Sequence, residues 1–169
     1  GFFDELFAAD GIPHQNVKEL ITHLNSLSIK DLKRKQRAAE LSLYQHGITF
    51  SVYGNKQGTE KIFPFDLIPR VITANEWETL EKGLIQRVHA LNLFIHDIYN
   101  RKLILKNKVI PSELILQSEG YLKQCIGLIP PKNRWIHISG SDLVRDKSGT
   151  FYVLEDNLRC PSGVSYVLE

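Results

Sequence analysis

The chain has 169 residues, of which 43% are hydrophobic and 24% are charged, as is typical of a soluble globular protein with a real core. Its formal net charge of +2 is too small to make a polyanion the expected partner, and no stretch is apolar enough to span a membrane. Its two cysteines, Cys125 and Cys160, match no zinc or redox spacing, so we expect a reduced, cytoplasmic protein.

The N-terminal part of the sequence predicts two amphipathic helices. Residues 14–25 place apolar side chains at the spacing of one helix face. Ser28 and Asp31 have the spacing of a capping box, in a carboxylate variant, and Gly47 is a natural C-terminal stop for the second helix. The basic run over residues 30–37 lies on this second helix. We interpret it as a solvated face and expect no nucleic-acid partner.

From residue 48 onward, apolar residues recur at every second position, as they do in a strand. Residues 48–53 (ITFSVY) alternate as a half-buried strand does, and residues 60–65 (EKIFPF) predict a shorter partner strand. Pro64 and Pro69 make this partner an edge strand or an irregular crossing, not a central strand. Residues 73–76 match a capping box, and a long helical pattern follows through Tyr99. Gly83 would divide this helix in two, since a mid-helix glycine costs about 1 kcal/mol relative to alanine.

The last third of the sequence predicts a β-hairpin. A short strand over residues 103–105 and a helix that opens at Pro111 precede it. Residues 135–144 (WIHISGSDLV) and residues 150–157 (TFYVLEDN) each alternate, and the DKSG segment between them has turn chemistry. Helices followed by hairpins, without a βαβ rhythm, give the fold class α+β.

The second strand of the predicted hairpin ends in a group of oxygen-bearing side chains. Glu155 and Asn157 point to the same face of that strand, because side chains alternate. With the turn centred in DKSG, Asp142 lies opposite Val153 and diagonal to Glu155, close enough to share an ion. Two carboxylates and an amide oxygen suit Mg²⁺ and do not suit zinc. The alternative is that these are solvated turn residues.

The residues after this strand are candidates for binding an anion. Arg159 is a fixed cation that could pair with a phosphate or with an anion that develops from a carboxyl group. The turn at Ser162 and Gly163 has backbone amides that could approach an anion, so we place these two residues in cofactor binding. Two other arginines, Arg70 and Arg87, lie in apolar surroundings, where we favour structural ion pairs over a substrate role.

The segment VLEDNLRCPSG resembles the Glu-x-Asn magnesium motif of ATP-grasp enzymes, through Glu155, Asn157 and Arg159 and the Pro-x-Gly that follows. More specifically, the chain resembles the circularly permuted ATP-grasp family related to glutathionylspermidine synthase. Nearly everything from Gly47 onward takes part in this resemblance, and Cys160 departs from it, because a valine or threonine is expected there. The matching stretches are GITFSVYG, PFDLIPRVI, EWETLEKGLIQRVHALNLFIHDIY and SDLVRDKSGTFYVLEDNLRCPSGVSYVLE.

The resemblance implies a chemistry for these residues. Asp142, Glu155 and Asn157 would hold Mg²⁺ against the β- and γ-phosphates of ATP, and Arg159 would hold an acyl-phosphate or its tetrahedral successor. The implied reaction is activation of a small or peptide-like carboxylate by ATP, followed by attack of an amine to give an amide. Two alternatives stay open, a non-catalytic scaffold that keeps the fold and an ATP-dependent phosphotransferase.

The expected organisation is an N-terminal helical segment over residues 1–46 and part of the permuted ATP-grasp domain over residues 47–169. The sequence has no methionine and ends within the pattern of an element, so we expect a piece of a longer chain. In the permuted arrangement, the lysines that hold ATP lie beyond Glu169. We therefore expect these residues alone to bind metal weakly at most.

Overall fold

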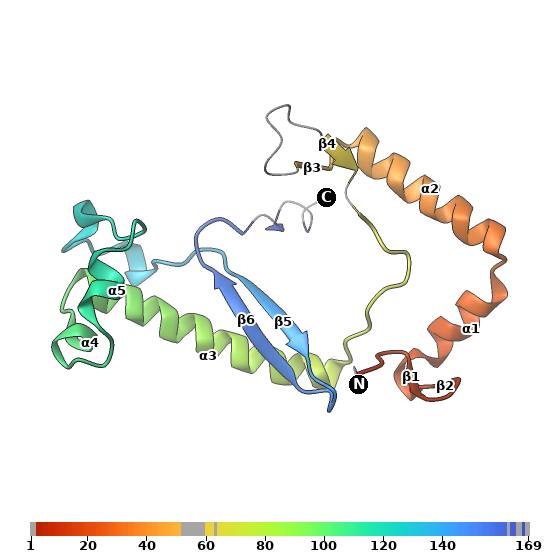
Figure 1. Ribbon diagram of the computed structural model, residues 1–169, viewed down its shortest axis with the longest axis horizontal. Helices are drawn as coiled ribbons and strands as arrows, with labels where there is room; N and C mark the ends of the chain where they lie inside the picture. The colour runs from red at the N-terminus through yellow and green to blue at the C-terminus, as the bar shows by residue number, and fades with distance from the viewer. Residues whose placement is uncertain (1–2, 52–59, 63, 162, 165–166, 168–169) are drawn as a thin grey trace. The chain divides into compact units, whose positions relative to one another are not determined.

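A computed structural model shows helices joined to small antiparallel sheets, so the predicted α+β class is confirmed (Figure 1). The chain divides into two compact units, residues 1–73 and residues 74–169. Among the residues that the structure describes, no helix is long and apolar enough to cross a membrane. The described residues are 3–51, 60–62, 64–161, 163–164 and 167.

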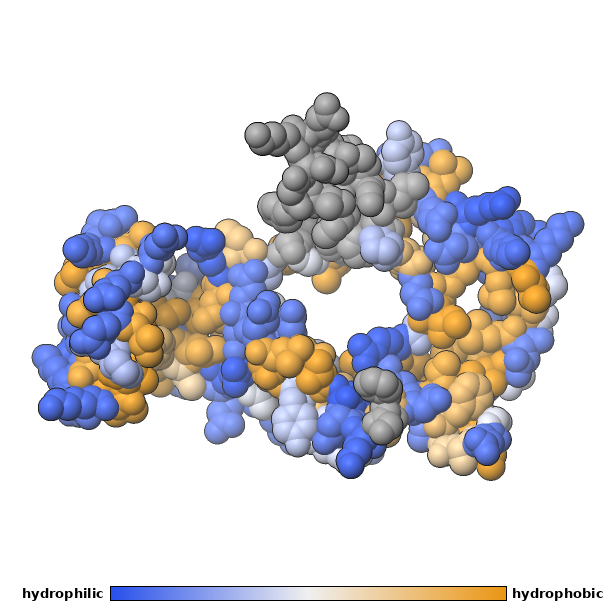
Figure 2. Space-filling model, in the orientation of Figure 1, coloured by the Kyte–Doolittle hydropathy of each residue, from blue (hydrophilic) through white to orange (hydrophobic). Residues whose placement is uncertain are grey.

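The first unit contains the two predicted helices and two short antiparallel strand pairs. Exposed apolar side chains occur on this unit and on the second, where Figure 2 shows them in orange. The predicted turn between the strands of the second pair lies outside the described residues. The elements are β1 (Phe7–Ala9), β2 (Ile12–Pro13), η1 (Gln15–Val17), α1 (Lys18–Ser26), α2 (Ile29–Gln45), β3 (Thr49–Ser51) and β4 (Glu60–Ile62).

Local sequence signals set both ends of α2. The Ser28 Oγ accepts a hydrogen bond from the Asp31 N–H (3.1 Å), and the Ser28 N–H donates to the Asp31 carboxylate (3.4 Å), so the predicted capping box is confirmed. The chain leaves the helix at Gly47, whose φ of +72° suits glycine. In the same unit, Arg70 forms an ion pair with Glu5 (2.5 Å), as expected of a structural arginine.

The second unit is built on one long helix, α3, with the hairpin β5–β6 along it. Gly83 does not divide α3, which is continuous, so this expectation was wrong. Packing and the flanking helical residues outweigh the modest propensity cost of one glycine. The elements are α3 (Ala74–Tyr99), α4 (Leu103–Lys106), α5 (Ser112–Leu116), η2 (Lys123–Cys125), η3 (Pro131–Asn133), β5 (Gly140–Arg145) and β6 (Phe151–Asn157).

The strand predicted over residues 103–105 is instead the short helix α4. The Asp97 carboxylate accepts hydrogen bonds from the backbone N–H groups of Leu103 and Ile104 (3.0 Å each). These are N–H groups that a helix start leaves without an intrahelical partner. Lys102, with φ of +55°, reverses the chain so that Asp97 can reach them. A side chain from the preceding helix thus decides the conformation of an apolar run.

The first strand of the hairpin begins at Gly140, later than predicted, because Trp135 and Ile136 are bonded to α3 instead of to a strand. The Asn92 side chain, 6% exposed, accepts hydrogen bonds from the backbone N–H groups of Trp135 (2.8 Å) and Ile136 (3.3 Å). Its amide donates to the Asn133 carbonyl oxygen (2.9 Å). The Trp135 ring stacks on Tyr99, with ring centroids 5.0 Å apart. One buried amide therefore fixes this segment against the helix.

Candidate metal centre

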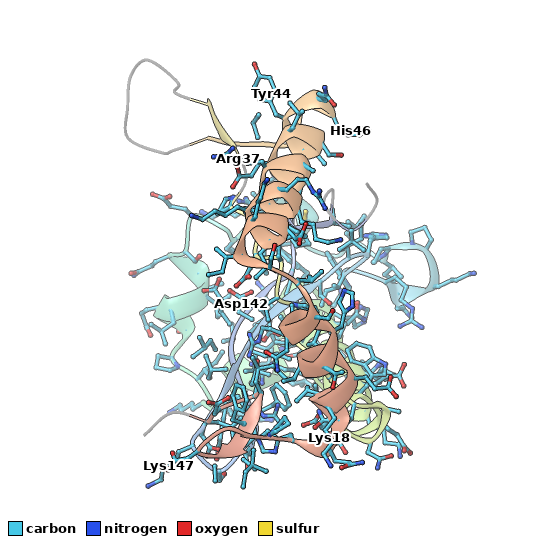
Figure 3. All side chains as sticks on the ribbon, turned by 90° about the vertical axis from the view of Figure 1, so that its right-hand side faces the viewer. Lys18, Arg37, Tyr44, His46, Asp142 and Lys147 are labelled. Atoms are coloured by element: carbon cyan, nitrogen blue, oxygen red, sulfur yellow. The ribbon has the colours of Figure 1, made fainter. Side chains whose placement is uncertain are left out.

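The hairpin that carries the predicted site is closed by an aspartate in its turn. The Asp146 carboxylate accepts hydrogen bonds from the Ser148 hydroxyl (2.6 Å) and N–H (2.9 Å) and from the Thr150 N–H (3.0 Å). Gly149 completes the turn with φ of +87°. Figure 3 labels Asp142 on strand β5 and Lys147 in this turn. The predicted DKSG turn is thus confirmed.

This turn gives the hairpin a stability that depends on pH. Hydrogen bonds from the Ser148 side chain, and then from backbone N–H groups, lower the pKa of Asp146 below its ordinary value of 3.8. A lowered pKa in the folded state means stability that is present above pH 3.8 and is lost as the pH falls through the lowered value.

We therefore expect the free energy of unfolding to decline more steeply in acid for the wild type than for Asp146→Asn. Urea titrations of both proteins at a series of pH values from about 2 to 7 would measure this difference. Glu119→Gln is a matched control in the same unit, because Glu119 is exposed and has no hydrogen-bond partner among the described residues. The prediction would be contradicted if the free energy of unfolding fell equally steeply with decreasing pH for the wild type and for Asp146→Asn.

The register of the hairpin brings Asp142 directly opposite Glu155. The sequence predicted Val153 at this position, and that prediction was wrong. Leu143 pairs with Val153, and the next pair along is Asp142 with Glu155, so Leu154 is an extra residue in β6. Such a β-bulge places two residues of one strand opposite one of its partner. The two carboxylates are therefore closer neighbours than the predicted diagonal pair.

The bulge also determines which side chains point away from α3. Asp142, Glu155 and Asn157 are all exposed, and we call the surface that they form with their neighbours the outward face of the hairpin. Asp156, between the last two, points to the opposite face, where its carboxylate meets α3. The three candidate ligands therefore lie on one face of one hairpin.

Asp156 is the residue of this site that sequence reasoning missed. Its side chain is 7% exposed, and its carboxylate accepts hydrogen bonds from the Arg87 Nε and the Ser141 Oγ, both at 2.7 Å. The expectation that Arg87 forms a structural ion pair is thus confirmed. An arginine in an apolar helical pattern was the available signal, but its partner lies 69 residues away in the sequence.

The third candidate ligand, Asn157, is bonded to the loop that follows β6. Its Oδ1 accepts hydrogen bonds from the N–H groups of Arg159 and Cys160, and its Nδ2 donates to the Cys160 carbonyl, all at 3.3 Å. These are long bonds, so the amide oxygen can turn to a cation at small cost. The loop folds back across the start of β5, where Pro161 lies 2.9 Å from the position that a Cβ on Gly140 would take.

The two carboxylates have no competing partners in the described part of the chain. Neither the Asp142 side chain nor the Glu155 side chain forms a hydrogen bond or an ion pair with a described residue. Within the described ranges, no three His, Cys, Asp or Glu side chains are grouped so that they could hold a metal. The donor set is therefore two carboxylates and one amide oxygen, which fits Mg²⁺, since this ion retains water and phosphate oxygens.

The predicted anion-binding residues follow in the same loop. Arg159 is exposed and forms no ion pair with any described residue. Gly163 is exposed in a turn that the Val164 N–H closes on the Pro161 carbonyl (3.4 Å). Ser162 lies outside the described residues. The Arg159 guanidinium and the turn at Gly163 therefore follow the three candidate ligands directly in the chain.

The opposite face of the hairpin forms an apolar groove with α3. The groove has a volume of about 920 Å³ and is lined by side chains that include Leu80, Leu84 and Arg87 of α3 and Phe151 and Val153 of β6. Figure 1 shows the hairpin lying along this helix. Because Asp142 and Glu155 point away from α3, they do not line this groove.

Comparisons with known proteins show which sequences this chain is similar to. The chain is 49% identical over 168 residues to an uncharacterized protein of Synechocystis sp., an alignment that covers 99% of the chain and 35% of that protein. It is 46% identical over 167 residues to an uncharacterized protein of Mycobacterium tuberculosis, of which 30% is covered. It is 34% identical over 167 residues to a Frankia casuarinae protein named "Putative glutamate--cysteine ligase 2-2", of which 19% is covered.

The chain thus spans about a third or less of the length of these relatives. The family model described as circularly permuted ATP-grasp type 2 matches residues 69–169, which include α3, the hairpin and the loop after it. The chain belongs to the circularly permuted ATP-grasp type 2 family.

Proposed function

We propose that this protein is an ATP-dependent ligase that requires Mg²⁺ and joins a carboxylate to an amine through an acyl-phosphate. The observation that carries the proposal is the direct opposition of Asp142 and Glu155 on the outward face of the hairpin, with Asn157 next along the strand. Membership of the ATP-grasp family supports ATP-dependent ligation at a coarse level.

The cross-strand acidic pair favours cation binding on physical grounds. Like charges directly opposite each other in a sheet destabilise it, by roughly 0.2–1 kcal/mol for an exposed pair. A cation between Asp142 and Glu155 would convert this repulsion into attraction, and the Asn157 oxygen would add a third oxygen ligand. A bound Mg²⁺ would supply Lewis acidity and neutralise phosphate charge there. Asp142, Glu155 and Asn157 would orient the phosphate oxygens of ATP relative to the hairpin.

The loop after β6 would act on the substrate side of the same centre. The Arg159 guanidinium has no ion-pair partner among the described residues, and a guanidinium binds a phosphate or carboxylate through two parallel hydrogen bonds. We assign it to hold the acyl-phosphate and the oxyanion that forms when the amine attacks. The amides of Ser162 and Gly163 are proposed contacts to a phosphate.

The substrates follow from the reaction class and from one relative. The Frankia casuarinae protein that is 34% identical is named "Putative glutamate--cysteine ligase 2-2", and such a name describes an amino-acid carboxylate and an amino-acid amine. We propose a small or peptide-like acid and amine for this protein as well. Amide formation with release of phosphate distinguishes a ligase from a phosphotransferase, which would release a phosphorylated product instead.

Calorimetry of ATP binding to the complete protein, with Mg²⁺ and with EDTA, tests the site. We define the magnesium increment as the ratio of the two ATP affinities. The double variant Glu155→Ala with Asn157→Ala is expected to lose this increment and to keep the affinity measured in EDTA. Glu81→Ala is the matched control, because the Glu81 side chain is exposed on α3 and has no hydrogen-bond or ion-pair partner among the described residues. An unchanged increment in the double variant would leave the hairpin a structural element and favour a scaffold.

A further inference from the structure

The bulge at Leu154 determines on which face of the hairpin the proposed metal ligands lie. From the turn, the hairpin pairs regularly as far as Leu143 with Val153. If that ladder continued without a bulge, Asp142 would oppose Leu154, and Glu155 would point toward α3. The extra residue reverses this, so that Glu155 and Asn157 share the outward face with Asp142.

Burial of apolar side chains does not select between these two registers. Leu154 is 67% exposed in the structure, and it would point outward in the regular register as well. Val153 keeps its place facing α3 in both. Within β6, the difference falls on the polar residues 155–157. The register that the hairpin adopts therefore depends on their contacts, together with those of the loop that follows.

The contacts at issue are those of one arginine and one serine. In the structure, Asp156 receives hydrogen bonds from Arg87 and Ser141, both at 2.7 Å, and lies directly opposite Ser141. In the regular register, Glu155 would lie opposite Ser141 and would take those donors in place of Asp156. A nearly buried carboxylate is tolerated only when it is paired, so the two acidic residues compete for one anchoring position.

We propose that Arg87 is a positioning residue, which binds Asp156 in preference to Glu155 and thereby holds the bulge that keeps Glu155 beside Asp142. This inference rests on the proposed function, because it assigns to the Arg87–Asp156 pair the geometry of that metal centre. The close contact of Pro161 with Gly140 favours the same register, since it fixes the loop that follows Asn157. Arg87 acts through Asp156 and touches neither metal nor substrate.

A direct test reads the register by disulfide formation, without ATP or metal. In the complete protein with its native cysteines replaced by serine, we compare the pair Asp142→Cys with Glu155→Cys against Asp142→Cys with Leu154→Cys. Directly opposed residues have Cα atoms roughly 4.5–5.5 Å apart, within the range for a disulfide. We expect the first pair to crosslink. Crosslinking of the second pair instead, with Asp156 intact, would overturn the inference.

The magnesium increment tests the consequence for the site. Asp156→Asn is expected to reduce it by about tenfold, the scale of losing a group that orients a metal ligand. Arg87→Lys, which keeps the charge, is expected to retain most of it. Glu76→Gln is the matched control, because it weakens another α3–hairpin ion pair, with Arg145, at the end of β5 away from the bulge. An equal loss in Glu76→Gln and Asp156→Asn would overturn the positioning role.

The two experiments separate this inference from the proposed function. If the wild type shows no magnesium increment, the proposed function fails, whereas the crosslinking still reports whether Asp142 opposes Glu155. If the wild type shows the increment and Asp156→Asn keeps it undiminished, the metal centre stands and the positioning role of Arg87 fails. Circular dichroism of each variant establishes that it is folded before its affinity is compared.

Discussion

Replacing Glu155 by alanine in the complete protein is expected to lower the rate of ATP-dependent amide formation by at least about a hundredfold. Loss of a group that only orients a metal ligand typically costs 10–100-fold, and Glu155 is proposed as a ligand itself. It lies opposite Asp142, so the variant would leave one carboxylate and one amide to hold the cation. Release of phosphate and of amide, measured with amino-acid acids and amines at saturating ATP and Mg²⁺, gives the rates.

Two comparisons make this result specific. Asp142→Asn is expected to lose activity to a similar degree, because the two carboxylates form one site, and the double variant should be little worse than either alone. Glu81→Ala should retain the wild-type rate. A Glu155→Ala protein with near-normal turnover would contradict a shared metal site. So would a double variant whose loss of rate equals the product of the losses in the Asp142→Asn and Glu155→Ala single variants.

Replacing Asn92 by leucine is expected to lower the free energy of unfolding by about 3 kcal/mol or more. Leucine has a similar size but no polar atoms, so the N–H groups of Trp135 and Ile136 and the carbonyl of Asn133 would lose their partner. A polar group left buried without a hydrogen bond costs about 1–3 kcal/mol. Urea unfolding followed by tryptophan fluorescence would measure the change, since Trp135 lies in this cluster.

The matched control for Asn92 is an amide on the same helix. The Gln86 side chain is exposed and has no hydrogen-bond partner among the described residues, so Gln86→Leu should change the free energy of unfolding by less than about 0.5 kcal/mol. Equal effects of the two substitutions would show that the Asn92 hydrogen bonds contribute nothing beyond the loss of an amide. In that case another interaction would have to fix residues 135–139.

Local signals in the sequence predicted the helices and the turns well. The capping box at Ser28 and the stop at Gly47 act within a few residues, and α2 begins and ends as they indicate. The turn after β5 is equally local, because Asp146 bonds to residues two and four positions along the chain. The α+β class follows from these elements. Such features are predictable because their energies depend on neighbours in sequence.

The parts that could not be predicted depend on side chains distant in sequence. Asn92 holds a segment more than 40 residues away, which is why residues 135–139 leave the strand that their alternation predicts. The candidate site shows both cases. The residue types of Asp142, Glu155 and Asn157 were visible in the sequence, and the structure brings them to one face. Their pairing was not visible, because the bulge depends on Arg87, 69 residues before Asp156.

The packing of Pro161 against Gly140 bears on how a saturation-mutagenesis map of this protein would look. Any side chain at position 140 would meet the proline ring, which has no flexible end to move aside. All nineteen substitutions there should therefore reduce function by displacing the loop that carries Arg159. On such a map, position 140 would resemble a reactive residue, although glycine has no side chain with which to react. Rescue of Gly140→Ala by Pro161→Gly would identify the constraint as one of space.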